Sequence, residues 1–230
     1  MPVTVTTVLP WLQNLNALAA GLFLLTAFGM VATRQVLGCL RFFMANGLFL
    51  ALSAFLLGGI LHSWHVFAVG VIDLVTKPML IPWLLRRIVR DEVYVRREID
   101  QVLNIPTSLL IVLAMTVAAY FLASPLLRAG DGLVGLNLPV GMAGLLIGAY
   151  TAATRREAVP LLLGLVAMEN AAFFAGIAIA PELPLIAELA IAFDVLVLVF
   201  IIAVLTRTVH EHLGTTEVGA LAQLREGETK

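Results

Sequence analysis

Four ionisable side chains lie in stretches of the sequence that are otherwise apolar: Asp73, Lys77, Glu169 and Asp194. A charge at the centre of a lipid bilayer costs at least about 2.5–3.5 kcal/mol on insertion scales. Burial disfavours the charged form of a carboxyl group, so that such a group can take up and release a proton near neutral pH. These residue types at these positions predict proton transfer within a membrane.

Glu169 and Asp194 have no charge partner on their own predicted helices. Leu165 and Phe173 flank Glu169 at a distance of one helical turn, and apolar residues flank Asp194 in the same way. Two titratable carboxyl groups at similar depth on consecutive helices indicate a proton relay. The alternative interpretation is a pair of protonated acids that only form hydrogen bonds with neighbouring helices.

Asp73 and Lys77 are four residues apart and therefore share one face of a predicted helix, with the acid nearer the N-terminus. They can neutralise each other. Pro78 follows directly and removes one backbone hydrogen bond, which predicts a bend at this point. The pair is either a self-satisfied structural ion pair or a switchable one, in which a proton on Asp73 releases Lys77. Four asparagines, Asn14, Asn16, Asn46 and Asn170, are expected to form interhelical hydrogen bonds rather than to bind ligands.

The composition places all of these residues in a membrane protein. Of the 230 residues, 61% are hydrophobic and 13% are charged, and the mean hydropathy is +1.02. Soluble domains are about 45–50% apolar and about 25% charged. The apolar stretches are continuous rather than alternating, which favours transmembrane helices over a barrel. The net charge of −1, without a basic stripe, argues against nucleic-acid binding.

The sequence indicates no redox or metal centre of its own. Cys39 is the single cysteine, so the chain has neither an internal disulfide nor a Cys-x-x-Cys pair for zinc or an iron–sulfur cluster. The four histidines form two pairs near predicted membrane edges, His62/His65 and His210/His212. We expect no bound metal, no cofactor and no catalytic residue in this chain.

Seven apolar stretches predict an all-α, polytopic membrane protein, with each helix long enough for a hydrocarbon core of about 30 Å. The helices are expected at residues 11–32, 36–61, 65–88, 105–127, 133–153, 158–180 and 183–206. With the N-terminus outside, twelve of the fourteen arginines and lysines fall on the cytoplasmic side. We therefore expect the N-terminus outside and the C-terminus inside, in the inner (plasma) membrane of a bacterial or archaeal cell.

The two halves of the chain share a spacing that predicts a tandem repeat. Asp73 lies thirteen residues before Arg86, and Asp194 lies thirteen residues before Arg207. Thirteen helical residues span about 20 Å, which takes an acid from mid-membrane to the cytoplasmic edge. The predicted parts are a first three-helix unit with a charged cytoplasmic loop (1–103), a connecting helix (104–130) and a second three-helix unit with a cytoplasmic tail (131–230).

The second unit resembles a known class of small membrane subunit. Arg155 and Arg156 in its first cytoplasmic loop, Glu169 in mid-membrane, Asp194 in the third helix and a short tail are similar to the 4L/K-type subunit. That subunit belongs to proton-pumping NADH:quinone oxidoreductase and to multisubunit cation/proton antiporters. One difference is that the third-helix acid of that family is usually Glu, whereas Asp194 is one methylene shorter.

The whole chain resembles hydrogenase-4 component E, a membrane subunit of formate hydrogenlyase and group 4 hydrogenase complexes. The segment Lys-Pro-Met-Leu-Ile-Pro-Trp-Leu-Leu-Arg-Arg at 77–87 is similar to that family's third helix. The resemblance implies a subunit that carries protons, or another cation, while other membrane and peripheral subunits hold the nickel–iron and iron–sulfur centres. Four arginines are expected to face the cytoplasm and to contact partners: Arg86, Arg87, Arg155 and Arg156. Two other functions remain open from the residues alone, a passive scaffold subunit and a stand-alone secondary transporter.

Overall fold

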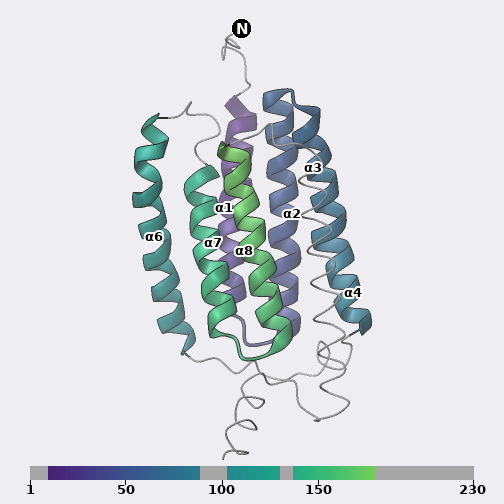
Figure 1. Cartoon of the computed structure of the whole chain (residues 1–230), viewed down its shortest axis with the longest axis vertical. Coiled ribbons are helices and arrows are strands. Elements are labelled where there is room, and N and C mark those ends of the chain that lie inside the picture. Colours follow the sequence, from purple (N-terminus) through teal and green to yellow (C-terminus); the bar gives the residue numbers. More distant parts are fainter. Residues whose placement is uncertain (1–9, 89–102, 130–136, 180–230) are drawn as a thin grey trace, which may run out of the picture.

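The computed structural model describes residues 10–88, 103–129 and 137–179, and these are almost entirely helical (Figure 1). The elements are α1 (Pro10–Ala32), α2 (Val36–Leu61), α3 (Trp64–Val75), the π-helix η1 (Thr76–Leu80), α4 (Ile81–Ile88), α6 (Ile105–Ala129), α7 (Asn137–Thr154) and α8 (Ala158–Ile179). The structure has helices at six of the seven predicted positions, with α3, η1 and α4 together forming the third. The seventh, at 183–206, lies outside the described residues, and Asp194 with it.

Several of these helices can cross a membrane. Five helical stretches are long and apolar enough by length and composition: Pro10–Ala32, Val36–Leu61, Trp64–Leu85, Ile105–Leu127 and Val159–Ile177. Their apolar side chains also remain on the outside of the bundle, where Leu25, Leu110 and Phe121 are more than 60% exposed. Apolar surface on this scale is favourable in lipid and unfavourable in water. The chain therefore fits a multi-pass, all-α membrane protein.

Two helical hairpins form the centre of the bundle. The hairpin α1–α2 lies against the hairpin α7–α8, with α1 touching α7 and α2 touching α8. The third span packs on α2, and α6 packs on α7 and α1 at the edge (Figure 1). Within the second hairpin the helices approach closely because glycines face the opposite backbone. A Cβ atom at Gly148 would lie 2.6 Å from the backbone nitrogen of Met168.

Large apolar side chains fill the contact between the two hairpins. Phe23 of α1 stacks on Phe174 of α8 with ring centroids 4.6 Å apart, and Leu50 of α2 joins the same buried cluster. A second cluster, which includes Phe43 and Leu163, extends this core toward α4. These clusters hold α8 against α2, which is the contact on which the candidate site depends.

The third span changes helix type in its middle. It is α-helical to Val75, forms one π-helical segment from Thr76 to Leu80 and continues as α4. Pro78 has no N–H to donate, and a wider turn accommodates such an interruption. The hydroxyl of Thr76 donates to the carbonyl oxygen of Ile72 at 2.8 Å. The sequence predicts a bend at Pro78, and the structure has a π-helix at this position.

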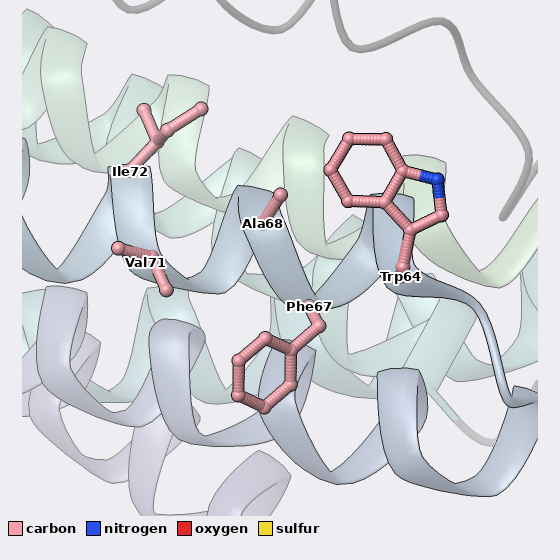
Figure 2. A pocket seen from close by; sticks show the side chains of 5 residues that line it. All are labelled: Trp64, Phe67, Ala68, Val71 and Ile72. Atoms are coloured by element: carbon pink, nitrogen blue, oxygen red, sulfur yellow. The ribbon is translucent and has the colours of Figure 1, made fainter.

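One outer surface of the third span suits contact with lipid. A hollow of about 500 Å³ on α3 is lined only by apolar or aromatic side chains: Trp64, Phe67, Ala68, Val71 and Ile72 (Figure 2). Trp64 and Trp83 are both more than half exposed and stand near the two ends of the span. The helical rise between them is about 28 Å, close to the hydrocarbon thickness of a bilayer. Tryptophans are enriched at both membrane interfaces.

The short connections α1–α2 and α7–α8 lie at the same end of the bundle as the C-terminus of α4 (Figure 1). Exposed arginines of the described residues occur in or beside these connections: Arg34, Arg41, Arg87 and Arg156. The guanidinium of Arg87 lies over the ring of Trp83, 5.4 Å from its centroid. The exposed arginines within the described residues thus share one end, and the sidedness itself stays a prediction.

Candidate functional site: a buried ion pair between three helices

Asp73 and Lys77 form a buried ion pair in the middle of the third span. The distance from Lys77 Nζ to Asp73 Oδ1 is 2.6 Å. Lys77 is 3% exposed and Asp73 is 4% exposed. Asp73 lies in the last turn of α3, and Lys77 lies within η1. The predicted pairing of these two residues is therefore confirmed.

Lys77 lies against two other helices as well. On one side a Cβ atom at Gly47 of α2 would be 3.0 Å from the Cβ atom of Lys77, so only a glycine fits there without displacement. On the other side Lys77 Nζ lies over the ring of Phe173 of α8, 4.9 Å from its centroid. An ammonium group in this position is stabilised by the ring quadrupole. The pair therefore occupies the junction of the third span, α2 and α8.

Glu169 is carried by the same helix that covers Lys77. It lies four residues before Phe173 on α8, hence one helical turn away on the same face, and it is partly buried. The structure thus brings together two of the four predicted relay residues, Asp73 and Lys77, and places Glu169 one helical turn from the ring over which Lys77 lies.

A buried hydrogen-bonded chain adjoins this junction. The side-chain nitrogen of Asn170 donates to Asn46 Oδ1 at 3.1 Å, and Asn46 Nδ2 donates to the carbonyl oxygen of Phe23 and to Thr26 Oγ1 at 3.1 and 3.2 Å. Thr26 Oγ1 donates to the same carbonyl at 2.7 Å. The expected interhelical role of Asn46 and Asn170 is confirmed, and the chain links α1, α2 and α8.

A second polar cluster joins the hairpins nearer the other end of α1. Ser53 Oγ donates to Asn16 Oδ1 at 2.6 Å, Asn16 Nδ2 donates to Asn137 Oδ1 at 2.9 Å, and Asn137 Nδ2 donates to Ser53 Oγ at 3.1 Å. Each of the three buried side chains both gives and receives a bond, so they form a closed ring. The interhelical role of Asn16 was predicted from the sequence, whereas those of Ser53 and Asn137 were not. Asn14 is exposed.

The Arg155 side chain is buried in the helix bundle rather than exposed on its surface. It is 4% exposed, and its Nη2 donates to the carbonyl oxygens of Met30, Val31 and Thr33 at 2.7, 3.1 and 3.2 Å. These carbonyls end α1, where helices leave acceptors without intrahelical donors. Burial lowers the pKa of the Arg155 guanidinium. Arg155 therefore ties the α7–α8 connection to α1.

The other arginines expected to contact partners differ from Arg155. Arg87 and Arg156 are exposed, as a partner contact requires, and the Arg86 side chain lies outside the described residues. His62 and His65 are exposed at the α2–α3 connection. Within residues 10–88, 103–129 and 137–179, no three His, Cys, Asp or Glu side chains gather in a way that could hold a metal ion.

The fold and site define an all-α membrane protein with an ion pair buried between spans. Among proteins of known sequence, the chain is similar to the uncharacterized protein Rv0085 of Mycobacterium tuberculosis, with 29% identity over 208 residues. The similarity covers 90% of this chain and 94% of the relative, so the two share nearly their whole length. No family model matches the chain, and no solved structure matches it.

Proposed function

We propose that this chain is a membrane subunit of a hydrogenase-like respiratory complex and takes part in moving protons, or another cation, through ionisable groups in mid-membrane. The resemblance of the segment at 77–87 to hydrogenase-4 component E supports the choice of complex. Redox chemistry would take place on partner subunits, and this chain would supply sites that change charge. The proposed location is the inner membrane, with the N-terminus outside.

The observation that carries the proposal is the buried pair of Asp73 and Lys77. Removing two charges from water costs several kcal/mol per ion, and replacing a buried pair by apolar residues is often neutral or stabilising. Stability alone therefore gives no reason to keep an acid and a base here. A function in which the pair changes its charge state on binding a proton would be a reason to keep both residues.

The residues would act as follows. Glu169 and Asp194 would hold and release protons, because each carboxyl group belongs to an apolar stretch that is predicted to span the membrane. A proton on Asp73 removes the negative partner of Lys77. The positive charge of Lys77 then acts on α8 through the face that carries Phe173 and Glu169. Proton occupancy in one span is thereby coupled to the electric field at the next.

Replacement of Glu169 by Gln in the native complex tests this proposal, because it keeps the size of the side chain and removes the exchangeable proton. We expect assembly to be unchanged and proton translocation, measured as acidification in inverted vesicles per electron pair, to be impaired. Glu157→Gln, in the α7–α8 connection, is the matched control and should have no effect. Normal proton translocation per electron pair in assembled complexes with Glu169→Gln would contradict the proposed proton relay.

A passive scaffold is the second candidate, and the ring of Asn16, Ser53 and Asn137 favours it because its polar atoms only bond helices to one another. A scaffold would tolerate amide replacements of Asp73, Glu169 and Asp194 together. Gentle solubilisation followed by identification of co-purifying proteins separates both candidates from a stand-alone transporter, which would purify alone.

A further inference from the structure

Asn170 carries a buried oxygen atom whose orientation its neighbours determine. The carbonyl oxygen of Phe23 can only accept hydrogen bonds, so Asn46 must turn its amide nitrogen toward it. The oxygen of Asn46 then faces α8, and Asn170 must present its own nitrogen there, at 3.1 Å. The side-chain oxygen of Asn170 is the atom left over, and the opposite amide orientation would leave two oxygens facing each other.

This oxygen atom has no hydrogen-bond donor among the residues that the structure describes, and Asn170 is 0% exposed. A buried acceptor left without a donor is destabilising, because it loses its bonds to water and gains none in the protein. Asp73 Oδ2, on the carboxylate that Lys77 binds through Oδ1, is also buried without a hydrogen-bond donor. The ammonium group of Lys77 bonds to Asp73 and lies over Phe173 of α8, the helix that carries Asn170.

Lys77 has donors to spare. An ammonium group carries three N–H donors, and the bond to Asp73 Oδ1 uses one of them. Its Nζ lies over Phe173, three residues after Asn170 and hence on the same face of α8. On α2, the residue that touches Lys77 is Gly47, and the residue that binds Asn170 is its neighbour Asn46. Lys77 and Asn170 thus meet the same turn of α2.

We infer that Asn170 is a second acceptor for Lys77, whose ammonium group moves between the Asp73 carboxylate and the Asn170 side-chain oxygen. With Asp73 ionised, the ion pair holds Lys77 on the third span. With Asp73 protonated, the ammonium loses its counter-charge, and the neutral oxygen on α8 satisfies it. Asn170 then changes from a residue that only links helices into part of the ion-pair site.

The ionisable groups around Lys77 are few. Asp73 faces it from α3, and Glu169 lies one turn from Phe173 on α8. On α2 the facing residues are Asn46 and Gly47, with Cys39 and Arg41 more than a turn away, and Arg87 lies toward the end of α4. A role of this movement in transport rests on the proposed function. The contact between Lys77 and Asn170 does not.

Solid-state nuclear magnetic resonance can test the contact directly in the full chain in lipid vesicles. The chain has two lysines, Lys77 and Lys230, so the conservative change Lys230→Arg leaves one lysine signal. With ¹⁵N at lysine Nζ and ¹³C at asparagine Cγ, the dipolar coupling between the two labels reports their distance. Asp73→Leu removes the competing carboxylate without adding a labelled asparagine.

We expect a strong lysine–asparagine coupling in the Asp73→Leu variant and a weaker coupling in the chain that keeps Asp73. The coupling should be lost when Asn170→Ala is added to Asp73→Leu. Asn137→Ala, in the ring at the other polar cluster, should leave the coupling in place. Absence of the coupling in Asp73→Leu, or its survival in Asn170→Ala, would overturn the inference. Should Asp73→Leu fail to fold, the chain with Asp73 intact is measured at acidic pH, where protonation removes the same charge. Because no transport is measured, failure here and failure of the relay are separate results.

Discussion

Gly47 and Lys77 face each other where α2 touches η1, and a Cβ atom at position 47 would lie 3.0 Å from the Cβ atom of Lys77 and 3.3 Å from Cδ of Pro78. The α2 backbone at Gly47 therefore packs directly against the first side-chain atoms of Lys77 and Pro78. This approach sets the depth at which the ammonium group lies between α2 and α8.

Enlarging Gly47 should push η1 away from α2. We expect Gly47→Val to destabilise the chain by about 1–3 kcal/mol, the usual cost of overpacking, and to lower its apparent melting temperature in detergent. Gly59→Val is the matched control, because Gly59 lies on the same helix and a Cβ atom there meets nothing within 4 Å. Equal melting temperatures for the two variants would contradict the close contact.

Breaking the ion pair should cost more than removing it. Lys77→Met leaves the Asp73 carboxyl group buried without its partner, and the loss of one partner of a buried pair costs about 3–5 kcal/mol. The double variant Asp73→Leu with Lys77→Met buries no charge and should recover most of that stability. Thermal unfolding of the purified chains measures both effects. A double variant as unstable as Lys77→Met would show that packing, rather than charge, holds the site together.

Removing Arg155 should release the end of α1. Arg155→Ala takes donors from three backbone carbonyls and should cost about 1–3 kcal/mol, since buried acceptors are left unsatisfied. Arg156→Ala changes the neighbouring, exposed arginine and should lie within about 0.5 kcal/mol of the unmodified chain. Hydrogen exchange at the backbone amides of residues 28–32 should rise in the first variant and stay unchanged in the second.

The polar ring should behave as one unit. Asn16→Leu and Asn137→Leu each remove two of its three bonds, so the double variant should be little worse than either single variant. Each single loss should be about 0.6–2 kcal/mol, as for hydrogen bonds between membrane helices. Additive losses in a double-mutant cycle of unfolding would mean that the residues act independently.

The helices could be predicted from the sequence because apolar runs in a membrane protein must close all of their backbone hydrogen bonds within the helix. The Asp73–Lys77 pair was predictable for a similar reason, since its two residues are four apart on one helix. Pro78 predicted a bend, whereas the structure has a π-helix there, which packs closely against Gly47 of α2. That contact is between spans and has no signal in local sequence.

The burial of Arg155 could not be predicted, because a charged residue in a short connection is usually solvated. Its position follows from the three acceptors at the end of α1, which tertiary packing brings within reach. Asn137 and Ser53 were missed because polar side chains at such positions are common, and only the facing helix shows that they close a ring. Asn170 was expected to bond to another helix. That its side-chain oxygen is left without a donor follows only from the position of Asn46 on the facing helix.

The hairpins α1–α2 and α7–α8 are fastened at three depths: by Arg155 at one end, by Asn46 and Asn170 in the middle, and by the asparagine–serine ring toward the other end. The third span packs on this assembly through apolar contacts with α2 and through Lys77, whose ammonium group lies over Phe173 of α8. We therefore expect the four-helix centre to stay rigid. A change in the charge of the third span would then displace that span relative to the other four helices.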